Sequence, residues 1–202
     1  MSAFITGGFS VQPRSPWNAN NLVNKNGEDF VAWNWRAAGF ANAFNVLENG
    51  TVTTSSSAAT AGITAGSITT GWNVSANRDA GFSIVTSTSP AGAYTWGHGL
   101  SKAPELWIHK ATNYTYGWET MYNPSDWNRI FLNTSAATAT NTFYSATDTV
   151  LSNAGWGQVN NFVTYCFHSV DGFSKIGSYT GTGVSGNVQY LGFEPAFLMW
   201  KA

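Results

Sequence analysis

Charged side chains are scarce in this chain of 202 residues. Lys and Arg together number 9 and Asp and Glu number 10, so charged residues make up 9% of the sequence. Ordinary soluble proteins have roughly 25%. The formal net charge is −1 and no basic cluster occurs, which argues against nucleic acid as a partner. A surface of hydroxyls and amides is typical of extracellular β-proteins and of assemblies whose faces are covered by neighbouring subunits.

Cysteine and long apolar runs are scarce as well. Cys166 is the single cysteine, which rules out an internal disulfide. It lies in an alternating segment, and this position predicts a small buried side chain. No stretch approaches the roughly 18 apolar residues of a membrane span, and the first residues lack the basic and apolar run of a signal peptide. We therefore expect no membrane insertion.

A block of 31 residues, in contrast, occurs twice without a gap. Residues 81–111 read GFSIVTSTSPAGAYTWGHGLSKAPELWIHKA, and residues 172–202 read GFSKIGSYTGTGVSGNVQYLGFEPAFLMWKA. Repetition at a fixed spacing indicates an array of modules. The nine identical pairs are Gly81/Gly172, Phe82/Phe173, Ser83/Ser174, Ser87/Ser178, Gly92/Gly183, Leu100/Leu191, Pro104/Pro195, Lys110/Lys201 and Ala111/Ala202.

A second, shorter repeat shows where a module ends. Residues 30–35 (FVAWNW) correspond to residues 162–167 (FVTYCF), which lie just before the second copy of the block. A module therefore opens with the GFS block and closes with the FV segment. We divide the chain into 1–36, the closing half of a module; 37–80, an inserted arm with a hairpin; 81–170, a complete β-sandwich module; and 171–202, the opening half of a further module.

Hydrophobic periodicity is two almost everywhere, and a long amphipathic helix is absent. Short runs rich in β-branched and aromatic residues alternate with Gly, Pro, Asn and Ser clusters. This pattern predicts an all-β fold built on an antiparallel β-sandwich, with repeated half-modules at the termini. Strands are expected at 30–35, 67–70, 71–75, 81–88, 105–110, 118–122, 129–132, 162–168, 173–179 and 196–201. Expected core positions include Phe82, Leu106, Ile108, Val163 and Tyr165.

Six stretches of the chain resemble an uncharacterised β-rich repeat of tail-fibre and other virion-surface proteins of marine bacteriophages, many of which infect cyanobacteria. The resemblance covers nearly the whole length, and the order of its motifs is distinctive. The resemblance implies a location on the virion surface and a role in a tail fibre, and it supplies no catalytic residues. The stretches are NKNGEDFVAWNWRAAG at 24–39, FNVLENG with AGITAGSIT in the arm, GFSIVT at 81–86, GHGLSKAPELWIHK at 97–110 and FVTYCFHSVDGFSKIGSYTG at 162–181.

An aromatic cluster between residues 112 and 128 is the best candidate for recognition. Aromatic faces stack on the C–H surfaces of sugars, and the interleaved Asn and Thr residues offer hydrogen bonds to sugar hydroxyls. The alternative is that members of this set fill the sandwich core or a subunit interface. The candidate carbohydrate-binding residues are Tyr114, Tyr116, Trp118, Tyr122 and Trp127.

The sequence predicts neither a metal site nor a cofactor. His98, His109 and His168 form no close metal-ligand spacing with each other or with Cys and carboxylates. In the second copy of the block, His98 is replaced by Gln189 and His109 by Trp200. We therefore expect packing and turn roles for these histidines.

A glycosidase needs two carboxyl groups that face each other across a cleft. Glu105, Glu119 and Asp126 meet this need only if their strands are neighbours, and sequence does not show it. Asp79 and Asp171 precede GFS blocks and are expected to close turns through hydrogen bonds to the backbone. We therefore expect no catalytic residue and no enzymatic activity.

These observations favour a non-enzymatic virion-surface protein, a tail fibre or a related module, that assembles with copies of itself and with other virion proteins. A trimeric fibre and a head-to-tail assembly both remain open, as does contact with host surface glycans. The alternatives are a carbohydrate-binding module and a glycan-degrading enzyme. Left alone, each half-module would expose an apolar sheet face and an unpaired edge, so we expect the two ends to complete each other within a chain or between subunits. Their apolar residues include Val31, Trp33, Trp35, Phe193, Phe197, Met199 and Trp200.

Overall fold

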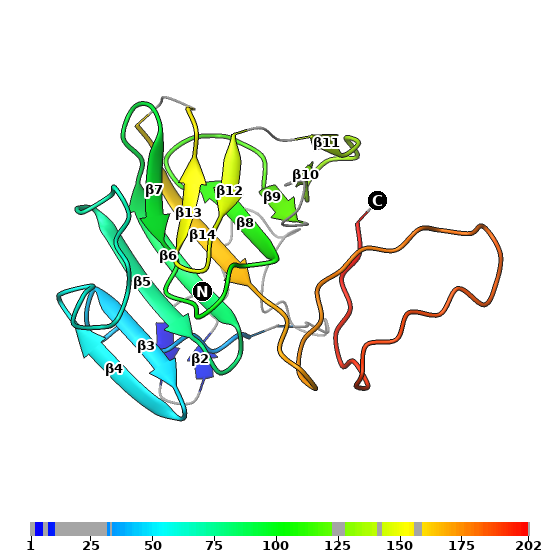
Figure 1. The fold of residues 1–202 in the computed structure, drawn as a ribbon, viewed down its shortest axis with the longest axis horizontal. Coiled ribbons are helices and arrows are strands. Elements are labelled where there is room, and N and C mark those ends of the chain that lie inside the picture. The colour runs from blue at the N-terminus through cyan, green and yellow to red at the C-terminus, as the bar shows by residue number, and fades with distance from the viewer. Residues whose placement is uncertain are drawn as a thin grey trace, which may run out of the picture. The chain divides into compact units, whose positions relative to one another are not determined.

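The computed structural model describes residues 3–5, 8–10, 32, 34–122, 128–140, 143–155 and 159–201. Over these residues the chain forms strands and no helix (Figure 1). It divides into two compact units, Met1–Trp35 and Arg36–Ala202. The strands are β1 Ala3–Ile5, β2 Gly8–Ser10, β3 Phe44–Glu48, β4 Thr51–Ser55, β5 Trp72–Asn77, β6 Phe82–Thr88, β7 Tyr94–Gly97, β8 Leu106–Ala111, β9 Glu119–Tyr122, β10 Asn128–Phe131, β11 Ala139–Thr140, β12 Tyr144–Ala146, β13 Val150–Asn153 and β14 Asn161–Phe167.

In the first unit, β1 and β2 form an antiparallel hairpin. The described strands of the second unit form two sheets. One has nine strands in the order β11-β10-β9-β8-β14-β6-β5-β3-β4, and the other has three in the order β12-β13-β7. Neighbouring strands are antiparallel except β3 and β5, which are parallel.

The two sheets pack face to face. Trp96 of β7 and Tyr144 of β12 contact Trp107 of β8, with ring centroids 5.7 and 5.2 Å apart. Aromatic pairs at such distances contribute both buried area and edge-to-face attraction. The predicted all-β, sandwich-like fold is therefore confirmed, with a large sheet that is mixed because of one parallel pair.

The expected arm at 37–80 supplies three strands, β3, β4 and β5, to the same nine-stranded sheet. A turn at Asn49-Gly50 connects β3 to β4, and both residues have positive φ, at 50° and 72°. An Asn-Gly pair suits this turn because both residues tolerate the left-handed region. The carboxylate of Asp79 accepts hydrogen bonds from both turn N–H groups, at 2.7 and 2.9 Å. Asp79 thus holds a turn thirty residues earlier in the chain. In the turn before β6, where Asp79 was expected to act, Asn77 Oδ1 accepts a hydrogen bond from the Ala80 N–H at 3.0 Å.

The face of the large sheet that lies in the core was predicted wrongly. Of the five expected core residues, Phe82 is buried, at 4% exposure, whereas Leu106, Ile108, Val163 and Tyr165 are half-buried. The residues of β8 and β14 that face the core alternate with the predicted ones. They are Trp107, His109, Thr164 and Cys166. A one-residue change of parity moves a whole strand to the other face. Both faces of β8 and β14 have apolar residues, so periodicity alone did not distinguish them.

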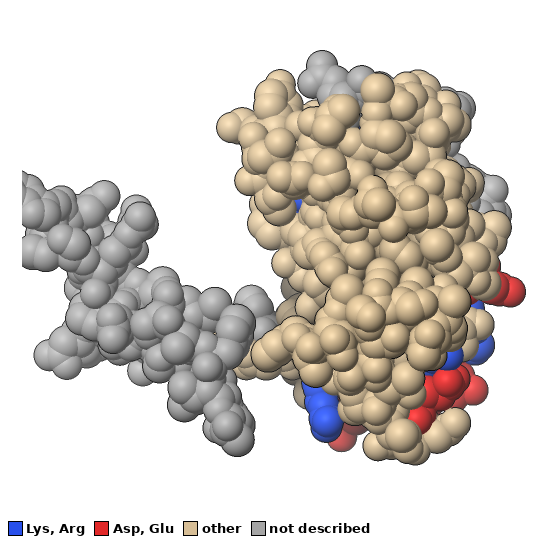
Figure 2. Space-filling view, turned by 90° about the vertical axis from the view of Figure 1, so that its left-hand side faces the viewer, with Lys and Arg blue, Asp and Glu red and all other residues tan. Residues whose placement is uncertain are grey.

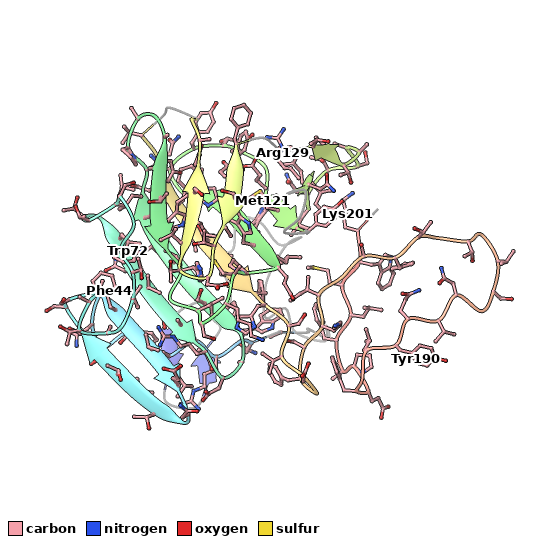
Figure 3. The ribbon with its side chains drawn as sticks, in the orientation of Figure 1. Phe44, Trp72, Met121, Arg129, Tyr190 and Lys201 are labelled. Atoms are coloured by element: carbon pink, nitrogen blue, oxygen red, sulfur yellow. The ribbon has the colours of Figure 1, made fainter. Side chains whose placement is uncertain are left out.

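Trp72 on β5 is a buried residue of the core. Its ring lies 4.7 Å from that of Phe44 on β3 (Figure 3), and its Nε1–H donates to the carbonyl of Gly97 at 3.0 Å. A Cβ atom at Gly97 would come within 2.0 Å of the Thr64 carbonyl oxygen. Glycine at this position lets the backbones approach closely.

Cys166 is fully buried, as predicted, and burial raises the pKa of its thiol to about 12.

The C-terminal copy of the repeated block does not form the two predicted strands, 173–179 and 196–201. Within the described residues 172–201, the backbone makes one isolated bridge, between Val170 and Ser174. The segment leaves β14 as a loop, drawn orange to red in Figure 1. Many of its large apolar side chains are exposed: Phe173, Tyr179, Val184, Val188, Tyr190, Phe197, Leu198, Met199 and Trp200.

Candidate functional site

The aromatic cluster lies mainly in the connection between β8 and β9. Tyr114 is 59% exposed and Trp118 is 40% exposed, whereas Tyr116 and Tyr122 are half-buried. Trp127 lies outside the described residues. The structure thus leaves two of the predicted aromatic residues accessible, in the part of the connection that holds no strand.

Tyr116 is held against the sheet. Its ring meets Phe131 of β10 edge-to-face at 5.7 Å, and its carbonyl accepts a hydrogen bond from Lys110 Nζ at 2.7 Å. The Arg129 guanidinium lies 5.4 Å from the Phe131 ring centroid, within the range of a cation–π contact. Gly117 makes this approach possible, because a Cβ there would come within 2.5 Å of the Phe131 ring. Tyr116 therefore anchors the connection.

Polar groups lie beside the aromatic residues, as the sugar-binding hypothesis requires. Asn133 accepts a hydrogen bond from the Trp118 backbone N–H through Oδ1, at 2.9 Å. The hydroxyls of Tyr122 and Thr138 are 3.2 Å apart. These hydrogen bonds hold the Trp118 backbone and the Tyr122 side chain. The rings of Tyr114 and Trp118 are the exposed apolar surface of the cluster.

Glu119, the first residue of β9, is a buried carboxylate directly after Trp118. Its side chain is 4% exposed, and Oε1 accepts a hydrogen bond from Arg129 Nη1 at 3.0 Å (Figure 3 labels Arg129). Its Oε2 accepts a hydrogen bond from the Tyr144 hydroxyl at 3.1 Å. Burial raises the pKa of Glu119, and the hydrogen bond and charge of Arg129 oppose this rise. Burial, and next the nearby Glu119 charge, also raises the pKa of Tyr144.

The other carboxylates proposed for catalysis are placed differently. Glu105 lies just before β8, and its Oε2 accepts hydrogen bonds from the backbone N–H of Ser169, at 2.7 Å, and from its hydroxyl. Asp126 lies outside the described residues. Glu119 and Glu105 each bind a distinct set of protein groups, one in the core and one at the end of β14.

All three histidines are buried, and burial lowers the pKa of two of them, His98 and His109. His109 shares a 2.8 Å hydrogen bond with Thr164 through Nδ1 and stacks on Phe162, with ring centroids 4.0 Å apart. Burial lowers its pKa to about 3. In the described part of the chain, no group of three or more His, Cys, Asp or Glu side chains is placed to hold a metal ion.

His98 connects two loops. Its Nε2 lies 3.1 Å from the Thr147 carbonyl, and its Nδ1 accepts the Leu100 N–H at 3.2 Å. A carbonyl needs a donor and an N–H needs an acceptor, so this geometry selects the tautomer with a proton on Nε2. Burial lowers the pKa of His98 to about 4.

Sequence reasoning identified Glu119 and His109 only as single candidates, and it did not foresee their partners Tyr144 and Thr164. These partners lie 25 and 55 residues away along the chain.

Among the described residues, no helix is long and apolar enough to span a membrane.

Comparison with known proteins places the chain in a family. No curated protein and no solved structure matched the chain. A family model covers residues 55–202, which include β5 to β14 and the C-terminal copy of the repeated block. Because this match spans well over half of its length, the chain belongs to the family described as "Domain of unknown function (DUF7483)".

Proposed function

We propose that this chain is a structural protein of a virion surface, a tail fibre or a related part of a bacteriophage, and that it assembles with copies of itself. One observation carries the assembly: the C-terminal copy of the repeated block forms no strand within the described residues and exposes a row of large apolar side chains. Exposed apolar surface on this scale is typical of a binding interface. The likeness of the motifs to tail-fibre repeats supports the location.

A second feature supports self-assembly. Strand β4 is an edge of the nine-stranded sheet, and its sequence, TVTTS, has neither charge nor proline. Natural proteins usually protect exposed edge strands with charged residues or proline, and β4 has neither. Figure 2 shows a face of the molecule that is formed almost entirely by uncharged residues, with the acidic and basic side chains gathered mostly toward its lower part. Such a face suits contact with another subunit.

The test is the mass of the native particle, measured by light scattering and by electron microscopy of negatively stained samples. The full chain is expected to form oligomers or filaments. Deletion of residues 187–202 is expected to abolish assembly, because it removes the exposed residues from Val188 to Trp200. The described strands all lie outside the deleted segment, so the fold is expected to remain. A full-length chain that stays monomeric at every concentration contradicts the proposal.

The exposed rings of Tyr114 and Trp118 favour a second candidate function, binding of host surface glycans. Screening on a glycan array is expected to identify a bound sugar, and Trp118→Ala and Tyr114→Ala are expected to weaken its binding at least tenfold. A tenfold loss corresponds to about 1.4 kcal/mol of binding free energy. Phe40→Ala is the control, because Phe40 is 89% exposed and lies outside the cluster.

A further inference from the structure

Strand β4 is an edge of the nine-stranded sheet, and two of its residues turn their backbone groups outward. Val52 lies opposite Leu47 of β3. The Leu47 carbonyl accepts a hydrogen bond from the Arg78 N–H, at the end of β5, at 2.8 Å. Because the backbone groups of Leu47 face β5, Leu47 and Val52 form a pair without mutual hydrogen bonds. The N–H and carbonyl of Val52 therefore point away from the sheet, and those of Thr54, two residues later, point the same way.

No hydrogen bond within the described part of the chain takes up these outward backbone groups. The Asn42 side chain donates to the hydroxyl of Thr54, at 3.0 Å, and does not contact its backbone groups. Residues 51–54 are exposed. An exposed edge strand whose N–H and carbonyl groups are unpaired is a template for an added strand.

The surroundings of β4 favour an uncharged partner. No charged residue occurs from Asn49 to Asn77, a stretch that includes β4, the connection after it and β5. Like charges on opposite strands destabilise their pairing, and two copies of this edge bring none together. A second copy of β4 supplies the same uncharged and largely β-branched sequence, TVTTS, which suits an antiparallel pair.

Strand β4 is also complementary to itself. A two-fold axis through Thr53, the middle of its five residues, gives every residue of the strand a partner. Val52 then lies opposite Thr54 of the second copy, and each such pair exchanges two N–H···O hydrogen bonds through the outward groups. Thr51 lies opposite Ser55 of the second copy, and Thr53 lies opposite Thr53. Cross-strand pairs of Thr and Ser stabilise antiparallel strands.

We propose that two copies of this chain join edge to edge through β4, antiparallel, with Thr53 of one copy opposite Thr53 of the other. The contact is isologous and closes on two copies. Two strands of this length cover only part of the roughly 1,200 Å² that a stable interface buries. The pairing therefore forms together with the contact through the exposed C-terminal residues. This inference rests on the proposed self-assembly and specifies one of its contacts.

Disulfide trapping of full-length T53C tests the pairing. Cα atoms of opposite residues in a non-hydrogen-bonded antiparallel pair are about 4.5 Å apart, a distance that a disulfide spans. We expect mild oxidation to give a covalent homodimer on a non-reducing gel. T51C is the matched control, because Thr51 is also exposed and lies opposite Ser55 instead of its own copy. It is expected to give at least tenfold less homodimer. Wild-type chains provide the blank, since Cys166 is buried.

A mixture of two variants tests the register. T51C and S55C are placed on chains with different labels and oxidised together. Because these two positions lie opposite each other in the proposed register, we expect a covalent heterodimer at a level at least tenfold above the homodimer of either variant alone.

The outcomes separate the two proposals. If light scattering shows oligomers but T53C links no better than T51C, pairing through β4 is wrong and self-assembly stands. If T51C and S55C link no better together than alone, the register centred on Thr53 is wrong. If the full chain is monomeric at every concentration, both self-assembly and pairing through β4 are wrong.

Discussion

Tyr144 and Glu119 join the two sheets of the sandwich through a buried hydrogen bond. The Tyr144 hydroxyl, on the three-stranded sheet, donates to Oε2 of Glu119, on the nine-stranded sheet, at 3.1 Å. Arg129 binds the other carboxylate oxygen at 3.0 Å. A buried carboxylate is stable only when its oxygens have such partners. This contact therefore makes packing of the second sheet depend on a polar group that the first sheet supplies.

Removal of the Tyr144 hydroxyl is expected to destabilise the fold. Tyr144→Phe leaves Glu119 Oε2 buried without its donor, which costs about 1–3 kcal/mol of the free energy of unfolding. Urea titration followed by tryptophan fluorescence measures this loss. Tyr114→Phe is the control, because Tyr114 is 59% exposed, and a change within about 0.5 kcal/mol is expected. Equal stabilities of the two variants would contradict a structural role of the hydrogen bond.

Gly97 is expected to tolerate no side chain. A Cβ atom would come within 2.0 Å of the Thr64 carbonyl oxygen and 2.8 Å of the Trp72 ring. Gly97→Ala then forces the backbone apart near the hydrogen bond between Trp72 and the Gly97 carbonyl. We expect a loss of about 3 kcal/mol or more, read from the midpoint of thermal or urea unfolding. Gly181→Ala, where nothing lies within 4 Å, is the matched control and is expected to change little.

Stability is expected to fall in acid because His98 and His109 are buried neutral. Burial lowers their folded pKa values from 6.5 to about 4 and about 3. The stabilisation is therefore complete above pH 6.5 and is lost as the pH falls through the window below it, where the unfolded chain takes up protons that the folded chain does not. Each histidine contributes a slope of about 1.4 kcal/mol per pH unit within its window.

The raised pKa of Glu119 gives the opposite pH dependence of stability. The contribution of the histidines is therefore measured by comparing the wild type with a variant that lacks them. The H98Q/H109Q double variant is expected to have a lower free energy of unfolding at pH 7 and a shallower decline between pH 6.5 and 4. Urea titrations at half-unit pH intervals provide both quantities. A decline as steep as that of the wild type would show that other groups cause it.

Catalysis is expected to be absent. Host polysaccharide incubated with the protein is expected to release no reducing sugar above the level of a heat-denatured sample. Glu119 is the carboxylate to test, because burial raises its pKa and general acids have raised pKa values. If an activity is found and Glu119→Gln abolishes it while Glu48→Gln does not, the non-enzymatic proposal is wrong. Glu48 is a suitable control because it is a partly exposed surface residue paired with Arg78.

The sequence by itself predicted the all-β fold class and several of the strands. Period-two runs predicted β6, β8, β9, β10 and β14 close to their observed bounds, because strand formation depends on local alternation and turn residues. The repeated GFS block and FV segment defined the opening and closing parts of a module. The three-stranded sheet of β7, β12 and β13 was missed, since its strands are short and have several polar residues.

The tertiary structure alone decided which face of each strand is buried, and which residues meet. His109 and Thr164 are polar, so the pattern assigned their parity to the outside. Both face the core, where His109 Nδ1 and the Thr164 hydroxyl share a hydrogen bond of 2.8 Å across 55 residues of chain. The insertion of β14 between β6 and β8 is likewise a long-range pairing. Local periodicity contains no information about which distant strand completes a sheet, because that choice depends on packing and hydrogen bonding between segments that meet only in the folded chain.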